Sequence, residues 1–139
     1  GAHFLAAFYI FLENPITGAG VKMFRVVCSE PSIIELVNSN AQACATHPHN
    51  QYFEILSETG LIGMLIILIL FVKILKYCKQ NMTNSFEVKL LTISIILVIW
   101  PLIPTGSIFT NHKLTYISYI ITFLLLCSKF NFSKLIKWK

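Results

Sequence analysis

Three long apolar runs constrain this chain more than any other feature. They are LIGMLIILILFVKIL (Leu61–Leu75), LLTISIILVIWPLI (Leu90–Ile103) and LTYISYIITFLLLC (Leu114–Cys127). With flanking neutral residues each run reaches about 18–20 residues, the length that a helix needs to cross about 30 Å of hydrocarbon. The sequence therefore predicts three membrane-spanning helices, at about residues 60–77, 88–104 and 113–128.

The composition agrees with a membrane protein. Of the 139 residues, 55% are hydrophobic and 12% are charged, whereas about a quarter are charged in a typical soluble domain. Too little polar sequence remains for an independent water-soluble core. We therefore expect an all-α integral membrane protein, with an extracytoplasmic helical segment over residues 1–59 and a transmembrane region over residues 60–139.

The lysines predict how the three helices are oriented. Four of them flank the first connection and four lie in the tail, whereas the second connection holds only Lys113: Lys73, Lys76, Lys79, Lys89; Lys129, Lys134, Lys137, Lys139. Loops rich in lysine stay in the cytoplasm, so the first connection and the C-terminus are predicted to be cytoplasmic. The net charge of +5 then reflects topology and anionic lipid headgroups, and we expect no nucleic-acid partner.

The predicted outer segment has an organisation of its own. Ala2–Glu13 is apolar and reads as a helix, which Asn14-Pro15 should end because the residue before a proline avoids the helical region. Gly18 and Gly20 then favour a tight turn. A second outer helix is expected from Ser32 onward, with Ser32 and Glu35 spaced as a capping box.

The segment before the first span combines histidine with small residues. If the helix restarts near His49, a spacing of 100° per residue places His49, Gly60 and Gly63 on one stripe. Glu54 and Glu58 then lie on roughly the opposite face, which is expected to be solvated; the alternative is that they hydrogen-bond sugar hydroxyls. Small residues at this spacing let a second helix approach closely. On their own, glycines near a helix start are typical of a packing device that has no part in chemistry.

Three short patterns in this order resemble one known family. His49-Asn50, nine residues, Gly60, two residues and Gly63 is similar to the H-[N/S/Q]-x9-G-x2-[G/T/Y] pattern of the O-antigen ligase/polymerase superfamily. LENPITGAGVKMF (Leu12–Phe24) resembles its NP-x-x-G-x-G-x-x-x-F turn, and PTGSIFTNHK its short loop before the closing helices. These are polytopic bacterial glycosyltransferases that use undecaprenyl-diphosphate-linked glycans, so the resemblance implies that this chain is the C-terminal third of a larger bundle in the inner membrane, with a periplasmic active site.

The resemblance also implies roles for individual residues. His49 would accept the proton of an acceptor hydroxyl as general base, since histidine takes up protons near neutral pH. Arg25 and Lys22 would bind the diphosphate, because guanidinium and ammonium groups match its charge. Asn50 and His112 are further candidates for substrate binding, and Asn14, Pro15, Gly18, Gly20, Gly60 and Gly63 form the structural motif.

Other candidate sites are weaker. His47 is expected on the surface, and although it stands near His49 with His3 and His112 in the same compartment, no cysteine or acidic cluster completes a metal site, so no metal or cofactor is expected. Cys28 and Cys44 are the cysteines placed where disulfides persist. They bond only if their Cα atoms come within about 7 Å.

Two other classes of function fit the apolar composition. A transporter or flippase for polyprenyl-linked glycans predicts cations inside the spans, where only Lys73 qualifies, near an end. A non-catalytic membrane subunit predicts that His49 is dispensable. For the enzyme, the acceptor is lipid A–core, a growing glycan or a protein hydroxyl, and the sequence does not choose among them.

The predicted topology can be tested by cysteine-accessibility labelling on intact cells. A cysteine introduced at Asn40 should react with an impermeant reagent, and one at Asn81 should be protected, because the lysines hold the first connection inside. The reverse pattern would overturn the orientation, and with it a periplasmic site.

Overall fold

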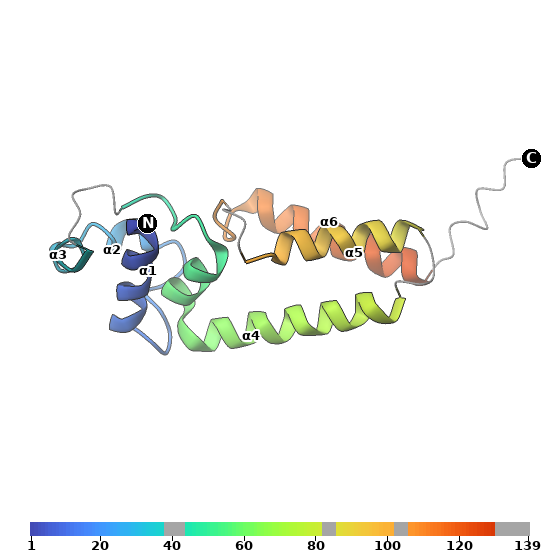
Figure 1. Ribbon diagram of the computed structural model, residues 1–139, viewed down its shortest axis with the longest axis horizontal. Coiled ribbons are helices and arrows are strands. Elements are labelled where there is room, and N and C mark those ends of the chain that lie inside the picture. The colour runs from blue at the N-terminus through green and yellow to red at the C-terminus, as the bar shows by residue number, and fades with distance from the viewer. Residues whose placement is uncertain (38–43, 82–85, 102–105, 130–139) are drawn as a thin grey trace, which may run out of the picture. The chain divides into compact units, whose positions relative to one another are not determined.

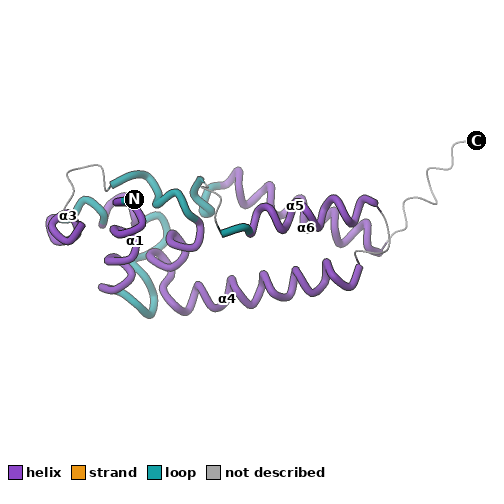
Figure 2. The backbone as a smooth tube through the Cα atoms, in the orientation of Figure 1, coloured by secondary structure: helices purple, strands orange, loops and turns teal. Residues whose placement is uncertain are grey.

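The computed structural model describes residues 1–37, 44–81, 86–101 and 106–129, and every regular element in these ranges is a helix. The helices are α1 (Ala2–Glu13), α2 (Phe24–Val27), α3 (Pro31–Val37), α4 (Gln51–Asn81), α5 (Phe86–Ile99) and α6 (Asn111–Lys129) (Figures 1 and 2). The all-α prediction is confirmed for this part of the chain. Asn40, Pro104, Lys134, Lys137 and Lys139 lie outside the described residues.

The chain forms two compact units. The first comprises Gly1–Leu68 with Pro101–Thr110, and the second comprises Ile69–Trp100 with Asn111–Lys139. Helix α4 begins in the first unit and ends in the second. The predicted outer segment and the short loop before α6 therefore fold together, and the first unit contains the motifs singled out above except His112.

Helix α1 has the bounds that the sequence predicts. It ends at Glu13, and the amide of Asn14 caps it by donating to the carbonyls of Ile10 at 3.3 Å and Phe11 at 3.1 Å. Pro15 follows and cannot continue the helix, because proline lacks an amide hydrogen and restricts the residue before it. Helix α3 starts at Pro31, one residue before the predicted cap, as proline favours the first helical position.

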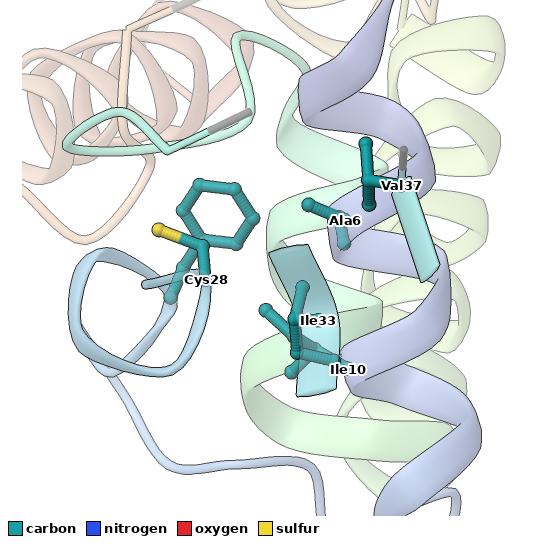
Figure 3. Close-up of a cluster of buried hydrophobic side chains, with 7 residues drawn as sticks. Ala6, Ile10, Cys28, Ile33 and Val37 are labelled. Atoms are coloured by element: carbon teal, nitrogen blue, oxygen red, sulfur yellow. The ribbon is translucent and has the colours of Figure 1, made fainter. Parts of the chain in front are cut away.

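The core of the first unit lies between α1 and α3. Figure 3 shows Ala6 and Ile10 of α1 against Ile33 and Val37 of α3, with Cys28 beside them. All five are buried, and Ala7 and Phe24 complete the cluster. Burial of a side chain the size of isoleucine contributes about 1.5–3 kcal/mol, so this small cluster holds the outer helices together and with them the turn that follows α1.

Helix α4 is kinked at Gly60, where φ is 63° and ψ is −163°. A kink of this kind breaks the helical hydrogen bonds across it. Here residues 15–20 replace them: the amides of Leu61 and Ile62 donate to the carbonyls of Pro15 (2.9 Å) and Ile16 (3.2 Å). In return, the carbonyls of Ser57 and Glu58 accept from the amides of Ala19 and Gly20, both at 2.9 Å. The glycine turn is thus bound to α4 by its backbone.

This close contact corrects the role expected for Gly60. A Cβ on Gly60 would lie 2.4 Å from the carbonyl oxygen of Ile16, and one on Gly18 would lie 2.3 Å from the carbonyl carbon of Glu58. In the described residues Gly60 therefore meets a turn and not a neighbouring helix. Gly63 is different, because the atoms nearest to a Cβ there would belong to the side chain of Thr59, in the same helix, and not to the backbone of the turn. Gly18 and Gly20 have the positive φ angles, 70° and 107°, that the turn prediction requires.

The part of α4 after the kink, residues 61–81, rises about 31 Å at 1.5 Å per residue, which matches the hydrocarbon thickness of a bilayer. Among the described helices, α4 is the one long and apolar enough to cross a membrane. Helices α5 and α6 have 14 and 19 residues. The presence of three spans therefore stays a prediction.

The second unit has its own apolar core. Helices α5 and α6 lie side by side (Figures 1 and 2), and Val88, Ile95, Ile120 and Leu124 pack with Cys78 of α4. A hydrogen bond between the hydroxyls of Tyr77 and Ser128 joins α4 to α6. This unit has the composition expected of helices that face lipid, with most of its large apolar side chains outside the core.

The backbone contact at the kink predicts unequal effects of two glycine substitutions. Gly60→Ala should destabilise the protein by at least about 1–3 kcal/mol, the cost of a residue with a Cβ in a backbone conformation that essentially only glycine adopts, with the clash against Ile16 added. Gly63→Ala should cost less, since Gly63 does not have the positive φ of Gly60 and its clash is with the side chain of one residue, Thr59, although the Cβ of Thr59 can yield only by a small backbone shift. Thermal denaturation in detergent measures both; a larger loss for Gly63→Ala would contradict this account.

Candidate functional site

His49 lies just before α4 and not on it. Its φ angle is 57°, the left-handed region that residues with a Cβ seldom occupy, and α4 begins two residues later at Gln51. The expected helical stripe from His49 to Gly63 is therefore wrong at its first member. The left-handed backbone turns the chain at this point, and the imidazole of His49 is exposed. Such strained residues concentrate at functional sites.

Asn50 holds this turn in place. Its Oδ1 accepts from the amides of Tyr52 (2.9 Å) and Phe53 (3.3 Å), which makes Asn50 the N-cap of α4. Its Nδ2 donates to the carbonyl of Pro101 at 2.8 Å, in the loop after α5. Both ends of the amide are thus engaged in fixing the residue next to His49. A role for Asn50 in substrate binding stays a prediction.

Three histidine rings lie close together in this unit. The ring of His49 is 5.3 Å from that of His3 and 4.5 Å from that of His47, measured between centroids. His47 is half-buried and its Nδ1 shares a 2.9 Å hydrogen bond with the hydroxyl of Thr46, so its expected surface position is only partly right. Among the described residues no group of three or more histidine, cysteine or acidic side chains is arranged to hold a metal ion.

The burial of Glu54 and Glu58 is the clearest departure from the sequence prediction. Both were expected on a solvated face, but each is only 2% exposed. The Oε2 of Glu54 accepts from the amide of Ile108 at 2.8 Å. Glu58 accepts twice, at Oε2 from the amide of Lys22 (2.6 Å) and at Oε1 from that of Phe24 (3.2 Å). A buried carboxylate is costly unless it is hydrogen-bonded, and backbone amides from two distant loops meet that requirement here.

Opposing effects act on the Glu58 carboxyl. Burial raises its pKa above the usual value, and the nearby charge of Glu54 adds to this rise. The amides of Lys22 and Phe24 and the positive charge of Lys22 lower the pKa, but burial prevails.

The cationic residues predicted to bind substrate differ in how they are held. Lys22 is itself left-handed, with φ 64°, and Glu58 binds its amide. Arg25 is the second residue of α2; its side chain is exposed and makes no ion pair among the described residues. His112 is exposed in the first turn of α6, in the second unit. The first unit thus carries His49, Asn50, Lys22 and Arg25.

A disulfide joins Cys28, at the end of α2, to Cys44, in the segment that leads to His49. Their Cα atoms are 5.2 Å apart, within the range that a disulfide spans. The other two described cysteines, Cys78 and Cys127, are free. The bond connects the helix of Arg25 with the chain that carries His49.

One known family matches the part of the chain that carries these residues. Residues 3–68 match the family model described as O-antigen ligase. This segment belongs to the O-antigen ligase family. It contains the turn, Lys22, Arg25, His49 and the two glycines Gly60 and Gly63. O-antigen ligase family proteins are embedded in membranes, as the length and apolar character of α4 also indicate. Comparisons with curated proteins and with solved structures give no match.

The Cys28–Cys44 bond can be tested by peptide mapping. Non-reducing digestion of the protein, with free thiols blocked before lysis, should yield one peptide pair that contains both cysteines. Replacing Cys44 by serine should lower the free energy of unfolding by about 3 kcal/mol, because the bond closes a loop of about 15 residues in the unfolded chain. Recovery of both thiols in blocked form would show that the bond does not form.

Proposed function

We propose that this chain is part of a glycosyltransferase that moves a glycan from undecaprenyl diphosphate to a hydroxyl acceptor, in lipopolysaccharide or related surface polysaccharide synthesis. The match of residues 3–68 to the O-antigen ligase family carries this proposal, because that segment contains His49, Arg25 and the turn that anchors them. We place the protein in the bacterial inner membrane as a multi-pass protein, with residues 1–59 periplasmic and the C-terminus cytoplasmic.

His49 is the proposed general base. Its imidazole takes the proton of the acceptor hydroxyl as the oxygen attacks the anomeric carbon. The bond from that carbon to the diphosphate oxygen breaks, and undecaprenyl diphosphate leaves with the electron pair. The exposed ring, at the start of a helix that continues into an apolar segment, suits a base that must meet substrates at the membrane surface.

Arg25 and Lys22 are the proposed ligands of the diphosphate. Negative charge grows on the diphosphate as the glycan leaves, and cations placed nearby stabilise this charge. The guanidinium of Arg25 has no carboxylate partner in the described part of the chain, so it remains available for phosphate oxygens. This chemistry needs no metal ion, and chelators should leave transfer unchanged.

The role of His49 is tested by substitution in the full-length protein. His49→Ala should lower glycan transfer about 10²- to 10⁴-fold, the usual contribution of a positioned general base. Transfer from purified undecaprenyl-diphosphate-linked glycan, with matched amounts of folded protein, measures the effect. A variant that keeps most of the wild-type rate would show that His49 is structural.

Backbone strain at His49 calls for two matched controls. His49→Gly relaxes the left-handed residue and His49→Asn tolerates it, and both remove the imidazole, so both should be as inactive as His49→Ala. Recovery of transfer in either one would assign the loss to backbone strain. His47→Ala removes the neighbouring ring and leaves the base, and its effect should be mild.

Arg25 is tested by a change that keeps the charge. Arg25→Lys should lower transfer by about tenfold or more, because an ammonium group cannot make the paired hydrogen bonds of a guanidinium and one charge-assisted bond contributes about 1.5–3 kcal/mol. Arg25→Gln, which also removes the charge, should lower it further. Equal rates for the wild-type protein and both variants would exclude Arg25 from the diphosphate site.

A further inference from the structure

We infer that Glu58 is a positioning residue for Arg25, and that it fixes the diphosphate-binding side of the site relative to His49. This inference rests on the proposed function. Glu58 touches no substrate in this scheme. It acts through the backbone of Lys22 and Phe24, to which both of its carboxylate oxygens are bound.

Helix α2 depends on Glu58 for its start. Four residues, Phe24–Val27, make up this helix, and its N-cap residue Met23 makes no side-chain capping bond. Glu58, 34 positions further along the chain, accepts from the amide of Phe24 instead. Arg25 is the next residue. The direction in which α2 leaves the turn, and so the direction of Arg25, is set by this contact.

The second bond of Glu58 supports an unfavourable backbone. Lys22 has a φ of 64°, the left-handed region that is unfavourable for a residue with a side chain. The 2.6 Å bond from its amide to Glu58 stabilises this conformation in a site where Glu58 is 2% exposed and water competes little. Without it, the turn between Gly20 and α2 has a more relaxed alternative that would redirect Arg25.

The first part of α4 fixes both the residue next to His49 and the start of the helix that carries Arg25. Glu54 and Glu58 are four residues apart and share a face of α4 ahead of the kink at Gly60, and Asn50, the N-cap residue, stands four residues before Glu54. Asn50 caps the helix beside His49, and Glu58 binds the start of α2 about 12 Å along the axis. Residues 51–59 therefore serve as a rigid spacer between the proposed base and the proposed diphosphate ligand.

Glu54 provides a control for this inference. It is as buried as Glu58 and lies one turn away, but it accepts one hydrogen bond, from Ile108 in the other loop. A glutamine at position 54 can still accept this bond with its carbonyl oxygen. At position 58 a glutamine must turn its NH₂ group toward one of two amide donors, so one of the two bonds is lost.

The test uses steady-state transfer by the full-length protein, with donor and acceptor varied separately. Glu58→Gln should raise the KM for the undecaprenyl-diphosphate donor about ten- to a hundredfold, the equivalent of one charge-assisted hydrogen bond, and leave the KM for the acceptor unchanged. Glu54→Gln should change either constant less than threefold. Glu58→Asp, which keeps the charge with a shorter reach, should lie between, and it serves if Glu58→Gln does not fold.

The double variant separates positioning from general stability. If Glu58 acts through Arg25, then Arg25→Lys should cost at least about threefold less in the Glu58→Gln protein than in the wild-type protein. Two results would overturn the inference. One is that the effects of Arg25→Lys and Glu58→Gln on transfer multiply independently in the double variant. The other is that Glu58→Gln leaves the donor KM unchanged and only reduces the amount of folded protein. Failure of the proposed function looks different: the wild-type protein would transfer no glycan, or His49→Asn would be fully active.

Discussion

The outer part of this protein depends on four backbone hydrogen bonds at the kink of α4. Gly60 interrupts the helix, and the two amides and two carbonyls that lose their helical partners bind residues 15–20 instead. Backbone groups cannot be left unpaired in a buried place without a cost of about 1–3 kcal/mol each. The kink and the turn therefore require one another, and a substitution that disturbs either leaves polar groups of both without partners.

This arrangement explains why an acidic side chain can be buried next to the kink. Once the carbonyl of Glu58 is bound to Gly20, its side chain lies beside the amides that follow Gly20 in the chain, those of Lys22 and Phe24. The carboxylate then fills the role that a capping side chain has in an ordinary helix. Burial away from water raises its pKa, to which the charge of Glu54 adds, and the amides keep the group compatible with burial.

The sequence predicted the elements that follow from local rules. Helix α1 and its end at Asn14 come from apolar composition and the proline after it, and the turn follows from Gly18 and Gly20. The family resemblance also came from the sequence, because its glycines, proline and histidine are fixed in spacing. Glu54 and Glu58 were misjudged, since charged residues are exposed by default and their partners are backbone amides, which carry no side-chain signature. The non-helical backbone of His49 was missed for a similar reason: Asn50, and not histidine, is the residue that starts the helix.

The kink also bears on how His49 meets a lipid-anchored substrate. If the hydrocarbon begins near Leu61, a straight helix would raise Asn50 about 16 Å above that level, at 1.5 Å for each of 11 residues. The headgroup region of a bilayer is only about 5–8 Å thick on each side, so the base would stand above a diphosphate held among the headgroups. Figure 1 shows the first part of α4 turned away from the axis of the long part, which makes 16 Å an upper limit. Under the proposed function, Gly60 therefore binds the turn and also lowers His49 toward the surface where the donor lies.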